Sequence, residues 1–143
     1  MEGTLVPLVL RLALATVIFP HGAQKVLGWF GGPGLKGTLD YFRKSGIPAP
    51  LAMLAIAAEF LGPLGLAAGL LTRMAALGIT SVMIVAIFRV HRQHGFFMNW
   101  SGNQGGEGFE YHLLVLGLAV ALIVGGAGAW SLDTLVAQWG NAS

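Results

Sequence analysis

Ionisable side chains occur inside or directly beside the long apolar stretches of this sequence. Six of them can exchange protons or bind anions at such a position: Arg11, His21, Lys25, Glu59, His91 and Glu110. Glutamate, histidine and lysine exchange protons, and arginine holds anions. We predict that these residues form a site for a ligand or for protons, with His94, Glu107 and His112 as less favoured members.

The composition places these groups in a membrane. Of 143 residues, 55% are hydrophobic and only 10% are charged, whereas a soluble domain has roughly 25% charged residues. Apolar stretches long enough to cross a bilayer cover about residues 4–27, 50–71, 73–92 and 110–129. The predicted fold is an all-α membrane protein, a four-transmembrane-helix bundle that forms a single domain over residues 1–143.

The connections between the predicted spans differ in character. In the first, from Gly28 to Ala49, interspersed apolar and charged residues predict a short amphipathic helix lying at the membrane interface. Thr72 and Arg73 leave room only for a tight antiparallel hairpin between the second and third spans. The third connection, residues 92–109, is rich in glycine, which predicts an extended chain with a tight turn.

The basic residues predict an orientation for the bundle. Six Lys and Arg residues lie in or beside the first and third connections, against two elsewhere. The positive-inside rule then puts both long connections in the cytoplasm and both termini outside. Because no basic segment precedes the first span and Arg11 interrupts it, we predict that this span is retained rather than cleaved.

Two classes of mechanism are excluded by composition. The sequence has no cysteine, so thiol chemistry is absent and any redox role must rest on a bound cofactor. Nucleic-acid binding needs a basic surface on a soluble body, and the pattern predicts none.

Glu59 lies near the centre of the second predicted span, about 13 Å along the helix. An ionisable group at that depth is costly unless it is paired, hydrated or neutral. Small residues share its helical face, which predicts that the glutamate faces the bundle interior; they are Ala52, Ala55, Gly62 and Gly69. Arg11 is its best predicted partner, either as an ion pair that locks two helices or as part of a substrate or proton site.

His21 and Lys25 fall on the same broad face of the first span as Arg11. Pro20 precedes them and predicts a bend, because proline frees a carbonyl about one turn earlier. We therefore predict that His21 and Lys25 form the rim of a polar pocket at the end of this span.

The acids at the start of the fourth span have two possible roles. Glu110 belongs to a face that also carries Gly117 and Val124, so we predict that it points inward, with Glu107 one turn earlier. Stabilisation of the helix N-terminus is the alternative role for both acids. His112 falls on a different side of that helix.

The histidines of the third span do not define a metal site. His91 and His94 are three residues apart and can bind one metal if both remain helical. The alternative is contact with lipid headgroups at the interface. Because the spacing of the histidines and acids matches no standard metal motif, we predict no metal site.

Short motifs recur in a fixed order along nearly the whole chain: Arg11-Leu12-Ala13, Gly22-x-x-Lys25, Gly28-Trp29-Phe30-Gly31-Gly32, Gly46-Ile47-Pro48-x-Pro50, Ala58-Glu59-Phe60, Gly69-Leu70-Leu71-Thr72-Arg73, Gly95-Phe96-Phe97, Gly106-Glu107-Gly108-x-Glu110 and Gly128-x-Trp130-Ser131-Leu132-Asp133. In their order and spacing they resemble the DoxX family of small four-helix bacterial membrane proteins. The resemblance implies a multi-pass protein of the bacterial inner membrane with links to redox chemistry, to quinone reduction and to partner enzymes. It supplies no catalytic residues.

Three functions remain open from the sequence. The first is a redox-associated subunit whose polar pocket binds a quinone, through His21, Lys25, His91 and Glu110 at one membrane face. The second is a non-enzymatic assembly partner or structural membrane protein. The third is transport of a small anionic solute past Arg11, which needs an oligomer, and the face with Gly65 and Gly69 offers one helix contact for it.

Overall fold

All regular secondary structure in residues 3–142, the part of the chain that the computed structural model describes, is helical. Its helices are α1 Val6–Leu27, α2 Gly34–Lys44, α3 Ala49–Ala68, α4 Thr72–Ala86, α5 Glu110–Gly125 and α6 Leu132–Ala142. A π-helical turn, Ile87–His91, and a 3-10 turn, Arg92–His94, prolong α4 without a break. The described residues contain no strand, so the predicted all-α class is confirmed.

Three helical segments are long and apolar enough to cross a bilayer by length and composition. They are α1, α3 and the continuous stretch Thr72–His94. The fourth predicted span is represented by α5, which has 16 residues. Its length of about 24 Å is less than the roughly 30 Å of a bilayer core.

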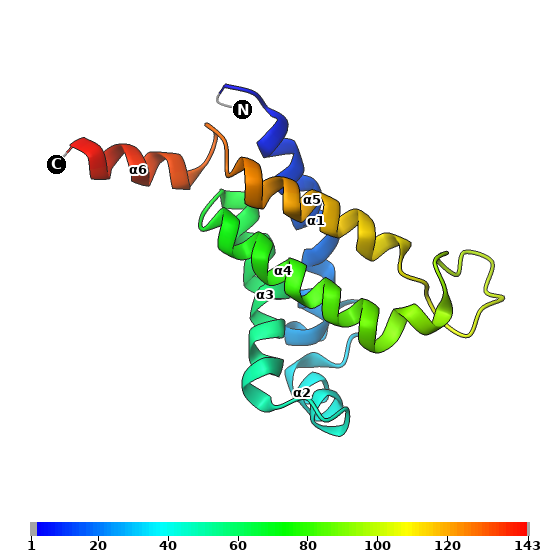
Figure 1. Cartoon of the computed structure of the whole chain (residues 1–143). Coiled ribbons are helices and arrows are strands. Elements are labelled where there is room, and N and C mark those ends of the chain that lie inside the picture. Colours follow the sequence, from blue (N-terminus) through cyan, green and yellow to red (C-terminus); the bar gives the residue numbers. More distant parts are fainter. Residues whose placement is uncertain (1–2, 143) are drawn as a thin grey trace.

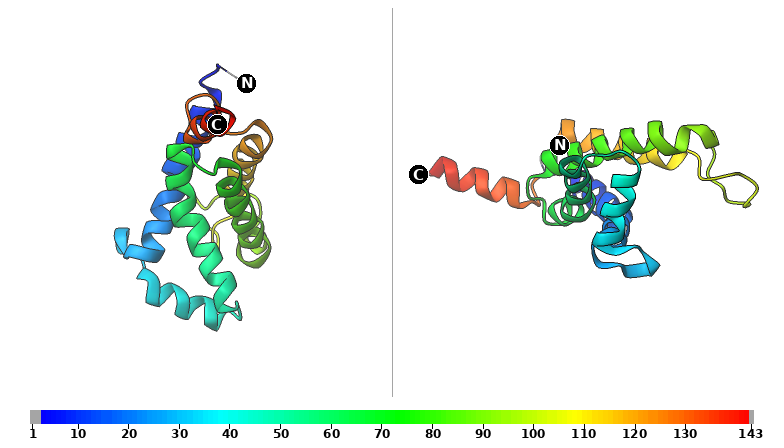
Figure 2. Two further views of the ribbon diagram at one scale, coloured as in Figure 1. Left: turned by 90° about the vertical axis from the view of Figure 1, so that its left-hand side faces the viewer. Right: turned by 90° about the horizontal axis from the view of Figure 1, so that it is seen from below.

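The helices form two pairs that cross obliquely. Figures 1 and 2 show α1 beside α3 and α4 beside α5, with the first pair joined to the second by the turn between α3 and α4. The shared core contains Leu14, Ile18, Leu66, Ile79 and Leu122. The terminal helix α6 extends away from this body (Figure 1), and the sequence pattern did not predict it.

Two glycines set the register between the antiparallel helices α1 and α3. A Cβ on Gly22 would lie 2.1 Å from the carbonyl oxygen of Glu59, so the two backbones touch there. A Cβ on Gly69 would lie 2.3 Å from Nη1 of Arg11. Arg11 therefore lies beside Gly69, which is ten residues beyond Glu59 in the sequence. Ten residues correspond to roughly 15 Å along a helix, so Arg11 and Glu59 are far apart.

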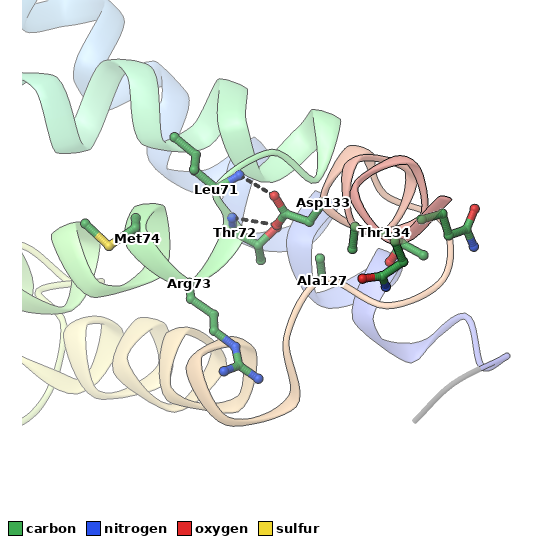
Figure 3. A pocket seen from close by; sticks show the side chains of 10 residues that line it. Leu71, Thr72, Arg73, Met74, Ala127, Asp133 and Thr134 are labelled. Atoms are coloured by element: carbon green, nitrogen blue, oxygen red, sulfur yellow. Dashed lines mark hydrogen bonds between the residues drawn. The ribbon is translucent and has the colours of Figure 1, made fainter. Parts of the chain in front are cut away.

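The turn between α3 and α4 is held by the distant C-terminal segment. Gly69 and Leu71 both adopt positive φ, 68° and 50°, which ends one helix and starts the next within three residues. Asp133 of α6 accepts hydrogen bonds from the backbone N–H groups of Leu71 (2.7 Å) and Thr72 (2.9 Å), as Figure 3 shows. The predicted hairpin is present, and a carboxylate stabilises the N-terminus of α4.

The Gly65 and Gly69 face is occupied within the chain. Gly69 is buried against Arg11 and Ser131, and the N–H of Leu70 donates to the carbonyl of Gly65 at 2.8 Å. These two glycines therefore take part in ending α3, and the expected use of their face for contact with a second copy stays a prediction.

The buried face of α5 also differs from the prediction. The structure buries His112, Val115, Ala119 and Leu122, while Gly117 is exposed and Val124 is 75% exposed. Both faces of α5 are apolar, so hydropathy does not separate lipid contact from helix contact. The expectation that the small-residue face points inward is wrong for this helix.

Candidate functional site

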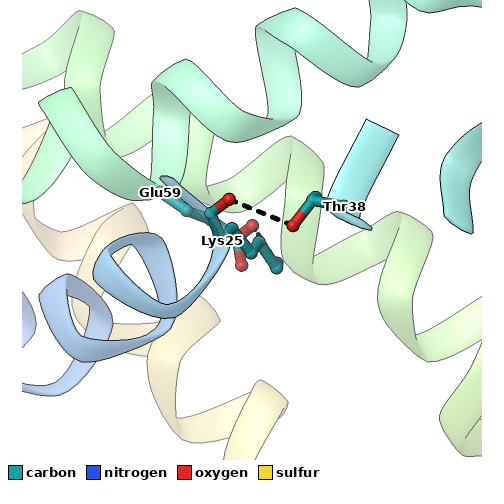
Figure 4. Close-up of polar contacts among 3 residues, drawn as sticks. All are labelled: Lys25, Thr38 and Glu59. Atoms are coloured by element: carbon teal, nitrogen blue, oxygen red, sulfur yellow. Dashed lines mark hydrogen bonds and ion pairs between the residues drawn. The ribbon is translucent and has the colours of Figure 1, made fainter. Parts of the chain in front are cut away.

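An ion pair joins α1 and α3 inside the bundle. Nζ of Lys25 donates to Oε2 of Glu59, and the two side chains are 29% and 5% exposed (Figure 4). The hydroxyl of Thr38, on α2, donates to the carbonyl of Lys25 at 3.1 Å and so attaches α2 to the end of α1. The inward orientation predicted for Glu59 is confirmed.

The predicted pair between Arg11 and Glu59 is wrong. Arg11 is fully buried, and its Nη1 donates to the carbonyl of Leu66 at 3.0 Å. A longer contact of 3.5 Å reaches the carbonyl of Ala67, and Nη2 donates to the carbonyl of Trp130. The register set by Gly22 places Glu59 beside the other end of α1, where Lys25 is the cation within reach.

Aromatic and imidazole rings continue from the ion pair to α5 and the π-helical turn, and the first of them, His21, is exposed. His21 of α1 lies against Tyr111 of α5, with ring centroids 6.2 Å apart. Tyr111 contacts His112 at 5.4 Å, and His112 contacts His91 of the π-helical turn at 4.0 Å. We call this set the ion-pair cluster; it comprises His21, Lys25, Glu59, His91, Tyr111 and His112. Four of its members were predicted site residues, His112 was a less favoured candidate, and Tyr111 was not predicted.

Two polar atoms of the ion-pair cluster are buried without a partner. The hydroxyl of Tyr111 and Nδ1 of His112 form no hydrogen bond with any described residue. His112 is only 7% exposed. Buried polar groups in proteins are nearly always satisfied, so an orphaned pair side by side marks a place where a ligand or water can bind.

A backbone contact fixes the tautomer of His91. Its Nδ1 lies 2.9 Å from the carbonyl oxygen of Glu107. A carbonyl only accepts, so Nδ1 carries a proton and, in the neutral ring, Nε2 is left as the acceptor. A π-helical turn adds one residue to a helical turn, and such turns are frequent at functional sites.

Glu110 and Glu107 lie outside the ion-pair cluster and organise the third connection. Oε1 of Glu110 accepts from the N–H of Met98 at 3.1 Å and from the indole of Trp100 at 3.3 Å. Oε2 of Glu107 accepts from the N–H of Asn99 at 2.7 Å. Both acids therefore hold residues 95–109, which contain turns and bends but no helix, and the inward orientation expected for Glu110 is not found.

His94 is also separate from the ion-pair cluster. Its Nε2 accepts from the side-chain amide of Gln93 at 3.4 Å, and its ring packs against Gly106. His91 and His94 lie in a π-helical and a 3-10 turn, so the regular helical pair that would share a metal is not formed. Within residues 3–142 no group of three or more metal-binding side chains comes together.

Tyr111 is the cluster residue that sequence reasoning did not select. It sits between Glu110 and His112, and its interfacial aromatic character was the only feature the sequence offered. The spacing of His112, Val115, Ala119 and Leu122 was a usable signal, because it repeats every three or four residues and starts at an ionisable group.

The best-formed surface hollows lie away from the ion-pair cluster. One of about 550 Å³ lies between the start of α4 and α6, and another of about 200 Å³ lies between α1 and α3. Neither of these two hollows is lined by a residue of the ion-pair cluster.

Similar proteins occur in several bacteria. An uncharacterised protein of Haemophilus influenzae is 33% identical over 132 residues, which cover 90% of this chain and 82% of that protein. "Putative oxidoreductase CatD" of Bacillus subtilis is 29% identical over 115 residues (80% and 76%). "Inner membrane protein YqjF" of Escherichia coli is 30% identical over 109 residues (76% and 79%). No solved structure matches.

The family comparison agrees with the sequence motifs. The sequence profile described as DoxX matches residues 6–92, which hold Arg11, Lys25, Glu59 and most of the bundle. The chain belongs to the DoxX family.

Proposed function

We propose that this bacterial inner-membrane protein is a redox-associated subunit whose ion-pair cluster binds the head group of a quinone. The proposal rests on one observation, the two orphaned polar atoms of Tyr111 and His112 beside a buried ion pair. A quinone head group needs hydrogen-bond donors for its ring oxygens and an apolar path for its tail. An oxidoreductase name on the Bacillus subtilis relative supports the redox association.

The residues of the ion-pair cluster fit such a ligand. The hydroxyl of Tyr111 is a donor without a partner, Nδ1 of His112 donates in the tautomer that is protonated there, and Lys25 is a cation that can attract a developing negative charge. Bound quinone supplies two-electron, two-proton chemistry. Glu59 holds Lys25 in place, and His91 offers Nε2 as a proton acceptor between His112 and the third connection.

Substitution of Tyr111 tests this role. We expect Tyr111→Phe to weaken binding of a short-chain ubiquinone or menaquinone analogue by about tenfold, the effect of one lost hydrogen bond in a buried site. The measurement is the analogue's thermal stabilisation of the purified protein. Tyr41→Phe is the matched control, because Tyr41 is 59% exposed on α2. Equal losses in both variants, or no stabilisation by any analogue, would contradict the proposal.

A non-enzymatic assembly partner is the second candidate. It is supported by the exposed aromatic side chains of the third connection, where Phe97 is 67% and Trp100 is 87% exposed. Transport past Arg11 is not supported, because that guanidinium is fully buried and bonded to backbone carbonyls.

We propose further that α5 completes four crossings, with both long connections in the cytoplasm and both termini outside. Because the sequence has no cysteine, single-cysteine variants report location directly. We expect Ser45→Cys and Asn103→Cys to be shielded from an impermeant maleimide added outside the inner membrane, and Asn141→Cys to react. Shielding of Asn141→Cys together with Asn103→Cys would refute the crossing by α5, because these two positions lie before and after that helix.

A further inference from the structure

A groove of about 550 Å³ separates the beginning of α4 from α6 (Figure 3). One part of its lining is apolar and the other is polar. The apolar residues are Leu71, Met74, Ala127 and Ala137, and the polar ones are Thr72, Arg73, Asp133, Thr134, Gln138 and Asn141. The groove lies at the end of the bundle away from the third connection, so it is independent of the proposed quinone site.

Arg73 provides an uncommitted positive charge in this groove. Its side chain is exposed, and neither ion pair found within residues 3–142 involves it. The one hydrogen bond that it donates is long, 3.5 Å to the carbonyl of Val124 near the end of α5. Arginine recognises phosphate through two parallel N–H groups, so this guanidinium can take a phosphate oxygen at little cost.

The remaining charge of the groove is already balanced. Asp133 accepts two backbone hydrogen bonds at the N-terminus of α4, which offsets its negative charge. Thr72 is fully buried, and its hydroxyl finds no hydrogen-bond partner among the described residues. The groove therefore has one available cation, Arg73, while the unsatisfied hydroxyl of Thr72 is buried.

The position of the groove indicates what surrounds it. It opens at the first residues of the candidate span Thr72–His94, which is the level of lipid headgroups. Leu71 and Met74 on its wall are 65% and 66% exposed. On α6 the exposed apolar residues recur at helical spacing, at Leu132, Leu135, Val136 and Trp139, so the apolar surface of the bundle continues onto this helix.

We propose that the groove between α4 and α6 is a binding site for a phospholipid. The phosphodiester contacts Arg73, the amides of Gln138 and Asn141 face the rest of the headgroup, and an acyl chain lies along Leu71 and Met74. The occupant is a lipid rather than free phosphate, because the wall is partly apolar and continuous with the surface that faces the bilayer.

Lipid-depleted protein in detergent tests the site. The probes are short-chain phosphatidylglycerol and, as its soluble part, glycerol 3-phosphate, and the measurement is thermal stabilisation over a titration. We expect Arg73→Gln to weaken phosphatidylglycerol binding by about tenfold. Ala137→Trp fills the groove without a change of charge and should have a similar effect.

Arg89→Gln is the matched control, because it removes the same charge from the other end of the same span. It should bind phosphatidylglycerol as the unaltered protein does. Undiminished binding by both Arg73→Gln and Ala137→Trp would overturn the site. An equal response to glycerol 3-phosphate would overturn the lipid as its occupant and identify a free phosphate ester instead.

Discussion

Replacement of Lys25 by methionine is expected to lower the free energy of unfolding by about 3 kcal/mol, because it leaves Glu59 without its cation in the interior of the bundle. Glu59→Gln should cost less, since Lys25 is 29% exposed and a long side chain can move its ammonium toward water. The double variant, Lys25→Met with Glu59→Gln, should recover much of the loss. Denaturant titration in detergent measures all three.

The exposed pair of Asp40 and Arg43 on α2 is the internal control for this cycle. Those side chains are 45% and 79% exposed, and Arg43→Met should change stability by no more than about 0.5 kcal/mol. Additive effects of the Lys25 and Glu59 substitutions would show that the two charges do not depend on each other. Such additivity would also remove the structural basis for an ion pair in the proposed site.

Loss of Arg11 is the second large effect that we expect. Its guanidinium joins the last turn of α3 to Trp130 in the segment before α6. Arg11→Met should lower stability by about 3 kcal/mol, the worth of two charge-assisted hydrogen bonds of roughly 1.5 kcal/mol each. Arg11→Lys should recover part of this, because an ammonium keeps the charge but lacks the planar fork of donors.

The C-terminal segment provides a readout specific to Arg11. Without the bond to Trp130, α6 is attached mainly through Asp133, so residues 126–131 should be cut faster by a protease added to the purified protein. Arg89→Met, at an exposed position, is the control and should leave the cleavage rate unchanged. A normal cleavage rate in Arg11→Met would show that Arg11 does not hold this segment.

Several features of the fold follow from local sequence. Long apolar stretches and the scarcity of charge are enough to predict a helical membrane protein, since only helices and closed barrels satisfy the backbone in a bilayer. The amphipathic segment in the first connection predicted α2. The small residues around Glu59 predicted its inward orientation, because small side chains let helices approach, and a Cβ at Gly22 would indeed meet the Glu59 backbone.

The partners of the polar groups depended on register between helices. Both Arg11 and Lys25 lie on the face of α1 that is turned toward α3, and sequence spacing cannot say which of them stands level with Glu59. The contacts of Gly22 and Gly69 set this register. As a result Glu59 pairs with Lys25, and Arg11 donates to backbone carbonyls. The sequence also does not show which face of α5 is buried, because the lipid-facing and protein-facing sides of this helix are equally apolar.

By itself, the sequence determined the membrane class, the long apolar helices and the inward position of Glu59, because these follow from the cost of placing charge and open backbone in lipid. Tertiary structure alone decided that Tyr111, His112 and His91 stand in a row beside Lys25 and Glu59. The reason is physical: helix-to-helix register and rotation are set by close packing between segments far apart in the chain, and no local pattern records it.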